Sequence, residues 1–224
     1  MKHIVKGLGF ALFMGAIGGT AWWWIQLPAL ADARGGAAAI TIDAALFSAF
    51  ALHHSLLARP RAKAVVARIV PDDLVRSAYV WAASLLLLAM CAAWQPIGYT
   101  VYEVTGPGAI VLLALQASGI LLSLLAVRMI SVSELAGLRP TRATDVLQFT
   151  GPYRLVRHPL YLGWVLIFFP VPHMTGDRLL FAGLSTLYLL VAMPLEEAAL
   201  THHYGERYLE YRRTVRWRLI PYIH

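Results

Sequence analysis

The chain has 224 residues, of which 59% are hydrophobic and only 14% are charged. A soluble domain usually has about 45–50% apolar and about 25% charged residues, so this composition excludes an ordinary soluble protein and indicates an integral membrane protein. The formal net charge of +7 does not indicate nucleic-acid binding, because the basic residues are concentrated in short stretches beside apolar segments, as the positive-inside rule produces.

Six apolar segments follow one another along the chain, near residues 7–30, 38–58, 78–97, 108–130, 158–173 and 179–195. A helix needs about 20 apolar residues to cross the hydrocarbon core, and the first four segments meet that length. The fifth and sixth are shorter, so we expect a tight helical hairpin that either crosses or is partly re-entrant. The first segment continues to Leu30, too far for the apolar region of a signal peptide, which has about 7–15 residues. The sequence thus predicts an all-α membrane bundle of five to six spans.

Lysine and arginine are unevenly distributed over the connections between these segments. Residues 59–76, 128–157 and the tail after 197 are rich in them, whereas the remaining connections are poor. Because cytoplasmic loops carry the excess of basic residues, this alternation places both termini in the cytoplasm. The tail over 197–216 has apolar residues at helical spacing, which predicts an amphipathic helix on the cytoplasmic face. With no linker in the sequence, we expect one domain over residues 1–224.

Polar residues that can perform chemistry gather near the C-terminus. They occur in the stretch 151–163, GPYRLVRHPLYLG, then at Glu196 and Glu197, and then over 202–211. A charged group at membrane depth is costly unless it is paired or faces water, so such clustering indicates a functional site.

The spacing in the first stretch favours a binding site at a helix end. Pro159 starts the fifth segment, so Arg157 and His158 lie at the positive N-terminal end of that helix, where free N–H groups suit an anion. Tyr161 follows His158 on the same helical face. Gly163 has no side chain and would let a flat group or another helix approach closely.

Glu196 and Glu197 end the sixth segment and would return to the same side of the membrane if 158–195 is a hairpin. Each residue of this group also has a structural interpretation. Arg157 can be a membrane anchor, His158 a helix cap and the two glutamates a solvated helix end, while Tyr208 and Tyr211 can be interfacial anchors.

Three ordered stretches, GPYRLVRHPLYLG, LEEAAL and YGERYLEYRRTV with a following IP, resemble the C-terminal half of the isoprenylcysteine carboxyl methyltransferase superfamily. The resemblance covers about 150–221, roughly the last third of the chain. It implies a multi-span methyltransferase with a membrane bundle over 1–130, and a region over 150–221 that binds S-adenosylmethionine through R-H-P-x-Y-x-G and the glutamate pair.

The resemblance also implies roles for individual residues. Arg157 would orient the acceptor or stabilise charge, and Glu197 would bind the cofactor or face the acceptor. The remaining positions would bind the cofactor: Tyr153, His158, Tyr161, Gly163, Glu196, Tyr208 and Tyr211. Transfer of a methyl group from a sulfonium is an in-line displacement, which requires alignment of the reactants rather than a metal. The chain has a single cysteine, Cys91, so we do not expect a cysteine-based zinc site.

The stretches FALHHSLLARP, VRSAYVWAASLLLLAMCAAWQPIG and PHMTGDRLLFAG are similar to the bacterial branch of this superfamily that contains methanethiol S-methyltransferases and NnrU-like membrane proteins. This similarity implies a bacterial-type inner membrane and a small lipophilic thiol as acceptor, such as methanethiol going to dimethyl sulfide. A prenylcysteine-like or other lipophilic carboxylate is the alternative acceptor. A non-catalytic NnrU-like accessory protein is the alternative from another class.

A histidine pair late in the second segment, His53 and His54, bears on the choice of acceptor. A neutral imidazole can take the proton of a thiol and generate the thiolate, so we expect His54 to be the catalytic base. A histidine that satisfies a polar group between helices is the alternative, and Glu134 and Asp145 have the same ambiguity. The expected partners are a lipophilic acceptor and membrane lipid, with the oligomeric state left open.

Overall fold

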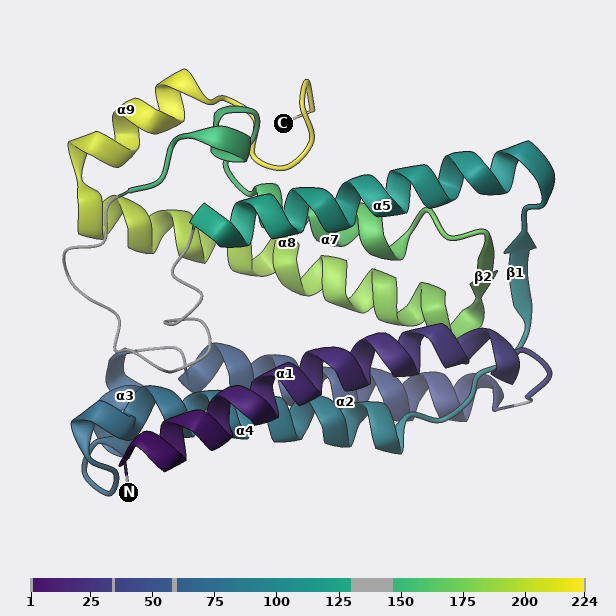
Figure 1. Cartoon of the computed structure of the whole chain (residues 1–224), viewed down its shortest axis with the longest axis horizontal. Coiled ribbons are helices and arrows are strands. Elements are labelled where there is room, and N and C mark those ends of the chain that lie inside the picture. Colours follow the sequence, from purple (N-terminus) through teal and green to yellow (C-terminus); the bar gives the residue numbers. More distant parts are fainter. Residues whose placement is uncertain (1, 34, 58–59, 130–146, 224) are drawn as a thin grey trace. The chain divides into compact units, whose positions relative to one another are not determined.

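The computed structural model describes residues 2–33, 35–57, 60–129 and 147–223. Glu134 and Asp145 lie outside these described residues. Within them the chain is mainly helical, with five helices long and apolar enough to cross a membrane and one two-stranded sheet (Figure 1). The predicted all-α membrane bundle of five to six spans is confirmed.

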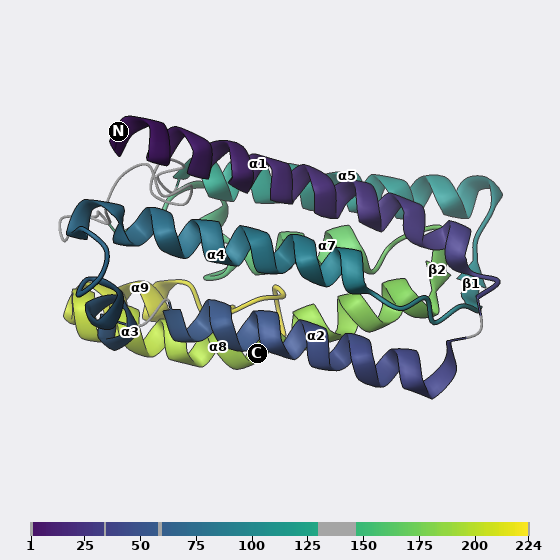
Figure 2. The same ribbon diagram turned by 90° about the horizontal axis from the view of Figure 1, so that it is seen from below.

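The chain forms two compact units, and unit 1 comprises residues 1–99 together with short segments from later in the sequence. Its elements are α1 (Lys2–Gln26), η1 (Leu27–Leu30), α2 (Gly36–Leu57), α3 (Pro60–Val66) and α4 (Asp72–Ala93). Helix α4 packs against both α1 and α2 and lies between them (Figure 2). The three long helices correspond to the first three predicted segments.

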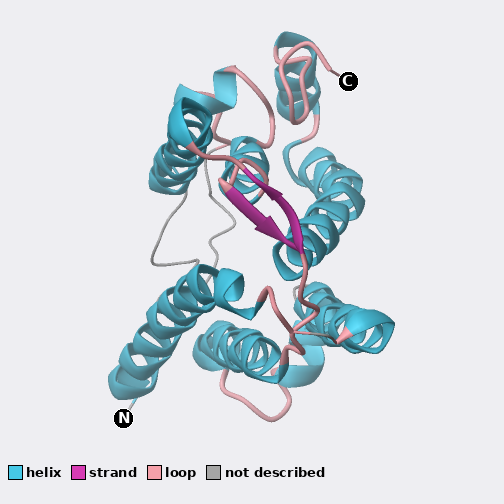
Figure 3. Cartoon of the chain, turned by 90° about the vertical axis from the view of Figure 1, so that its right-hand side faces the viewer, coloured by secondary structure: helices cyan, strands magenta, loops and turns pink. Residues whose placement is uncertain are grey.

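Unit 2 contains the described residues from Thr100 onward, without Thr175–Asp177, which belong to unit 1. Its elements are β1 (Thr100–Glu103), α5 (Gly106–Met129), η2 (Gly151–Arg154), α7 (Pro159–Phe168), β2 (His173–Thr175), α8 (Gly176–Tyr204) and α9 (Glu206–Thr214). The strands β1 and β2 pair with each other (Figure 3). All the predicted site residues except His54 belong to this unit.

Helix α7 covers only part of the predicted fifth segment, because the sequence after Phe168 is Phe-Pro-Val-Pro. Proline has no N–H, and it disfavours the helical conformation of the residue before it. The ten residues of α7 extend about 15 Å as a helix, and residues 169–175 add about 23 Å if extended. The sum is close to the length of α5, about 36 Å for its 24 residues. The segment thus returns the chain to the end of unit 2 where α5 begins.

The carbonyl groups freed where α7 ends are satisfied within unit 2. The Gln116 amide donates to the carbonyl oxygen of Ile167 at 2.8 Å, and the Tyr102 hydroxyl donates to that of Phe169 at 2.9 Å. The backbone N–H of Val104 donates to the carbonyl oxygen of Pro172 at 2.8 Å. Because lipid offers no hydrogen bonds, a helix can end at membrane depth only when the protein supplies such partners.

Gly163 sets the close approach of α7 to α5. A Cβ atom at this position would overlap Ser123 Oγ and would lie 2.9 Å from the carbonyl oxygen of Gly119. From the sequence, Gly163 could make room either for a flat group or for another helix. The structure shows the approach of a helix. Its predicted role in cofactor binding is not tested by this contact.

Two predicted boundaries near the C-terminus are wrong. Helix α8 runs without interruption over Gly176–Tyr204, so Glu196 and Glu197 lie inside it instead of at its end. The predicted tail helix over 197–216 is divided by Gly205, whose φ of 57° is in the left-handed region, and only α9 follows. Glu197 lies inside α8 and is paired with Arg157, so a carboxylate at this position does not mark the end of the helix.

We predict that Gly163→Ala lowers the free energy of unfolding by about 1–3 kcal/mol, the usual effect of overpacking a tight contact. The matched control is Gly183→Ala in α8, where a new Cβ meets nothing within 4 Å and the better helix propensity of alanine is neutral or stabilising. Thermal unfolding in detergent measures both. Equal midpoints for the two variants would contradict the packing argument.

Candidate functional site

The centre of the site is a buried ion pair between α7 and α8. Arg157 Nε donates to Glu197 Oε1 at 2.7 Å, and the two side chains are only 5% and 4% exposed. Arg157 lies just before Pro159 starts α7, and Glu197 lies two turns before the end of α8. The pair therefore joins the start of one helix to the interior of the other.

Arg157 also binds the backbone of the segment that follows α9. Arg157 Nη1 donates to the carbonyl oxygens of Val215 and Arg216 at 2.8 and 2.7 Å. The backbone N–H groups of Arg157 and His158 donate to the carbonyl oxygens of the next two residues, 217 and 218, at 2.9 Å each. The C-terminal segment thus lies along the start of α7 and supplies the acceptors that a buried guanidinium requires.

Two more basic groups approach the Glu197 carboxylate. His158 Nε2 is 3.4 Å from Oε1, and Arg218 Nε is 3.4 Å from Oε2. Burial lowers the pKa of His158, although the two glutamates oppose this shift and Arg157 adds to it. The imidazole is therefore neutral at pH 7 and can accept a hydrogen bond as well as donate one.

Glu196 faces differently from its neighbour, with a side chain that is 47% exposed. Its carboxylate accepts a 2.7 Å hydrogen bond from the Tyr161 hydroxyl and lies 3.7 Å from His158 Nδ1. The rings of His158 and Tyr161 are stacked, with centroids 5.1 Å apart. An accessible carboxylate beside aromatic faces is an arrangement that suits an organic cation.

The tyrosines of α9 belong to a cluster that packs against η2, the short helix that precedes α7. Tyr208 is almost fully buried and packs with Tyr211, Leu147 and Val215, and Tyr153 packs against this cluster. The Tyr211 hydroxyl donates to the carbonyl oxygen of Tyr153 at 2.8 Å. Burial raises the pKa of Tyr153 and of Tyr208 to about 12, so both phenols are neutral. These contacts position η2 against α9.

The structure brings Arg157, His158, Tyr161, Glu196 and Glu197 into one network, as the sequence predicts. The cofactor and acceptor roles predicted for them stay predictions. Arg218 and the carbonyl acceptors of the C-terminal segment were missed, because arginines after the last span are also what the positive-inside rule produces. No pattern in the sequence separates an arginine of that run that approaches Glu197 from one that faces only solvent.

His54 belongs to unit 1. The Tyr79 hydroxyl lies 3.0 Å from its Nδ1 and 3.2 Å from its Nε2, and the Arg76 guanidinium lies over the Tyr79 ring. Within the described residues, Nε2 of the neighbouring His53 is buried without a hydrogen-bond partner. The catalytic role of His54 stays a prediction.

Comparison with known proteins identifies methyltransferases. A family model described as phospholipid methyltransferase matches residues 109–207. The methanethiol S-methyltransferase of Crocosphaera subtropica is 39% identical over 211 residues, which are 89% of this chain and 82% of that protein. The enzyme of the same name from Mycobacterium tuberculosis is 37% identical over 195 residues, 83% of this chain and 80% of that protein.

A more distant relative has a different name. Nurim of Xenopus laevis is 30% identical over 174 residues, which are 70% of this chain and 61% of that protein. No solved structure matches the chain significantly.

We predict that Glu197→Gln destabilises the protein by about 3–5 kcal/mol, because it leaves the Arg157 charge buried without its counter-charge. Glu196→Gln is the matched control, since it makes the same chemical change one residue away on an exposed side chain. Unfolding followed by circular dichroism in detergent compares the two variants. A loss of stability as large for Glu196→Gln as for Glu197→Gln would contradict the assignment of the buried pair.

Proposed function

The chain belongs to the family of membrane methyltransferases that includes the methanethiol S-methyltransferases, and we propose that it methylates a small lipophilic thiol with S-adenosylmethionine as donor. Methanethiol is the proposed acceptor and dimethyl sulfide the product. Two relatives that are 39% and 37% identical to the chain are named for this activity. The names of these relatives favour an enzyme over a non-catalytic accessory protein.

The observation that carries the proposal is the exposed Glu196 carboxylate beside the stacked rings of His158 and Tyr161. The donor is a sulfonium cation, and a carboxylate with aromatic faces is the set of groups that attracts such a cation. The residues present therefore fit S-adenosylmethionine. Glu196, His158 and Tyr161 would hold it, and when bound it supplies an electrophilic methyl group.

We propose that Glu197 and Arg157 act by positioning other residues of the site. Their side chains are buried, and their hydrogen bonds fix the start of α7 and hence the direction in which His158 and Tyr161 face. An in-line displacement requires close alignment of the nucleophile and the methyl carbon. Tyr153, Tyr208 and Tyr211 would support the same site through the turn before α7.

The acceptor must lose its S–H proton before sulfur attacks, and we propose His54 as the group that receives it. The Tyr79 hydroxyl within hydrogen-bond distance of the ring orients the imidazole. With S-adenosylmethionine held by Glu196, His158 and Tyr161, transfer of its methyl group to the thiolate sulfur would give dimethyl sulfide and leave S-adenosylhomocysteine. A carboxylate acceptor is already ionised at neutral pH and needs no base.

We also propose that both termini face the cytoplasm of a bacterial-type inner membrane. The arginines of α9 and of the segment after it follow α8 directly, and basic residues beside a span favour the cytoplasmic side. The donor site would then open at the cytoplasmic face.

We predict that a bacterial host without its own dimethyl sulfide production releases this product when it expresses the chain and receives methanethiol. Headspace gas chromatography measures the product. Glu196→Gln should lower release at least about tenfold, because it removes the negative charge that attracts the sulfonium while it keeps an oxygen that can accept a hydrogen bond. Glu206→Gln, an exposed change in α9, is the matched control and should not alter release. No product from wild-type protein found in the membrane would refute the methanethiol assignment.

The variant His54→Gln separates a thiol acceptor from a carboxylate. For a thiol, loss of the base should lower the rate about a hundredfold at pH 7. The deficit should shrink as the pH rises toward the pKa of the acceptor thiol, because the thiolate then forms without a base. A rate equal to that of the wild type at every pH would exclude His54 as the base and favour an acceptor that needs none.

A further inference from the structure

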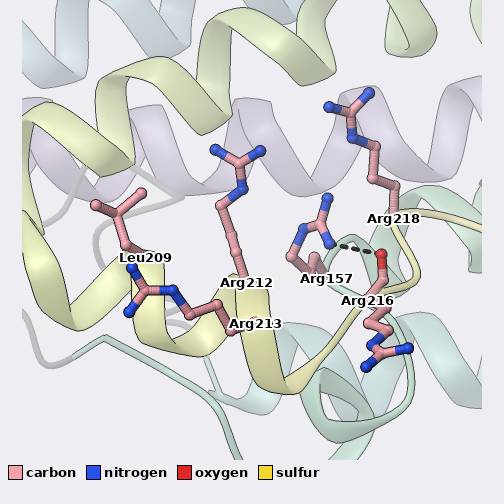
Figure 4. Close-up of a pocket in the computed structure, with 6 residues that line it drawn as sticks. All are labelled: Arg157, Leu209, Arg212, Arg213, Arg216 and Arg218. Carbon is pink, nitrogen blue, oxygen red and sulfur yellow. Dashed lines mark hydrogen bonds between the residues drawn. The ribbon is translucent and has the colours of Figure 1, made fainter.

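A pocket of about 640 Å³ opens between α9 and the segment that follows it, and its lining is strongly basic. It is lined by Arg157, Leu209, Arg212, Arg213, Arg216 and Arg218 (Figure 4). None of the described residues in this lining is acidic. Such a surface attracts an anion rather than the sulfonium for which Glu196 is suited.

Three of the five guanidinium groups extend to the same side of the pocket. Figure 4 shows Arg157, Arg212 and Arg218 directed that way, whereas the side chains of Arg213 and Arg216 turn elsewhere. The guanidinium of Arg213 pairs instead with the exposed Glu206 at 3.0 Å. The arginines available to one ligand are therefore Arg157, Arg212 and Arg218.

These three arginines retain unused positive charge and unused donors. Arg157 and Arg218 share the single charge of Glu197, and Arg212 forms no ion pair among the residues that the structure describes. Within the described part of the chain, Arg157 uses Nε and Nη1 in its hydrogen bonds, which leaves the two N–H groups of Nη2. Guanidinium groups bind phosphate oxygens through paired hydrogen bonds, so this arrangement fits a phosphate group.

We propose that Arg157, Arg212 and Arg218 bind the phosphate of an anionic phospholipid. Helix α9 starts directly after Gly205, where the membrane span α8 has ended, so the pocket lies near the level of lipid headgroups. The chain beyond Arg218 exposes Ile220 and Ile223, apolar side chains that suit the membrane interface. This inference is independent of the methyl acceptor.

The test uses the full-length chain in a neutral detergent with a mixture of phosphatidylglycerol and phosphatidylcholine that have the same acyl chains. Native mass spectrometry measures the ratio of the two lipids that stay bound. The wild type should prefer phosphatidylglycerol, and Arg212→Gln should weaken that preference roughly fivefold, the effect of one arginine at a lipid surface. Arg207→Gln removes the same charge from α9 outside the pocket and should keep the preference. Arg216→Gln should also keep it, because its guanidinium turns away.

Four results would overturn the proposal. They are no preference in the wild type, equal losses in Arg212→Gln and Arg207→Gln, displacement of the lipid by inorganic phosphate at equal concentration, and displacement by S-adenosylhomocysteine. The third would indicate a site for soluble phosphate, and the fourth would make the pocket part of the donor site. If Arg212→Gln does not fold, Arg212→Lys replaces it, since it keeps the charge and loses the paired geometry. Full retention of the preference in Arg212→Lys would then count against the proposal.

Discussion

The buried ion pair between Arg157 and Glu197 is the interaction on which the C-terminal half of the molecule depends. Desolvation of two charges can cost more than their mutual attraction returns, so such a pair persists only when further hydrogen bonds satisfy it. Here the carbonyl oxygens of Val215 and Arg216 satisfy the arginine, while His158 and Arg218 approach the carboxylate. The start of α7, the interior of α8 and the C-terminal segment are thereby held together. Because adjacent positions of a helix point in different directions, burying Glu197 leaves Glu196 accessible.

A second constraint shapes the same half of the molecule, since a helix that ends at membrane depth must find partners for its free carbonyl groups. Pro170 and Pro172 end α7 early. Groups in the β1–α5 region donate hydrogen bonds to the carbonyl oxygens that are left free. Gly163 brings α7 so close to α5 that there is no room for a side chain between them. A short, firmly packed helix of this kind is a rigid support for His158 and Tyr161, and rigid support is what alignment for a displacement reaction needs.

Much of this organisation could be predicted from the sequence, and the parts that could not have physical reasons. The length of each apolar run fixes the long spans, and the order of the R-H-P-x-Y-x-G stretch and the two glutamates indicates that they meet. The sequence does not distinguish Glu196 from Glu197, because their exposure depends on which one faces Arg157. It also placed the end of the last span at the glutamates, since hydropathy alone counts a paired carboxylate as a solvated one. The part that Arg218 and the carbonyl oxygens of residues 215 and 216 play depends on the path of the chain after α9, which no local pattern encodes.

In the proposed mechanism, the accessible face formed by His158, Tyr161 and Glu196 binds the methyl donor. Equilibrium binding of radiolabelled S-adenosylmethionine to the purified chain in lipid nanodiscs tests it most directly, with Glu196→Gln compared against the exposed control Glu206→Gln. We expect the wild type and Glu206→Gln to bind alike, and Glu196→Gln to bind at least about tenfold more weakly. Binding by Glu196→Gln that equals the wild type, or no binding by any of the three folded proteins, would contradict it.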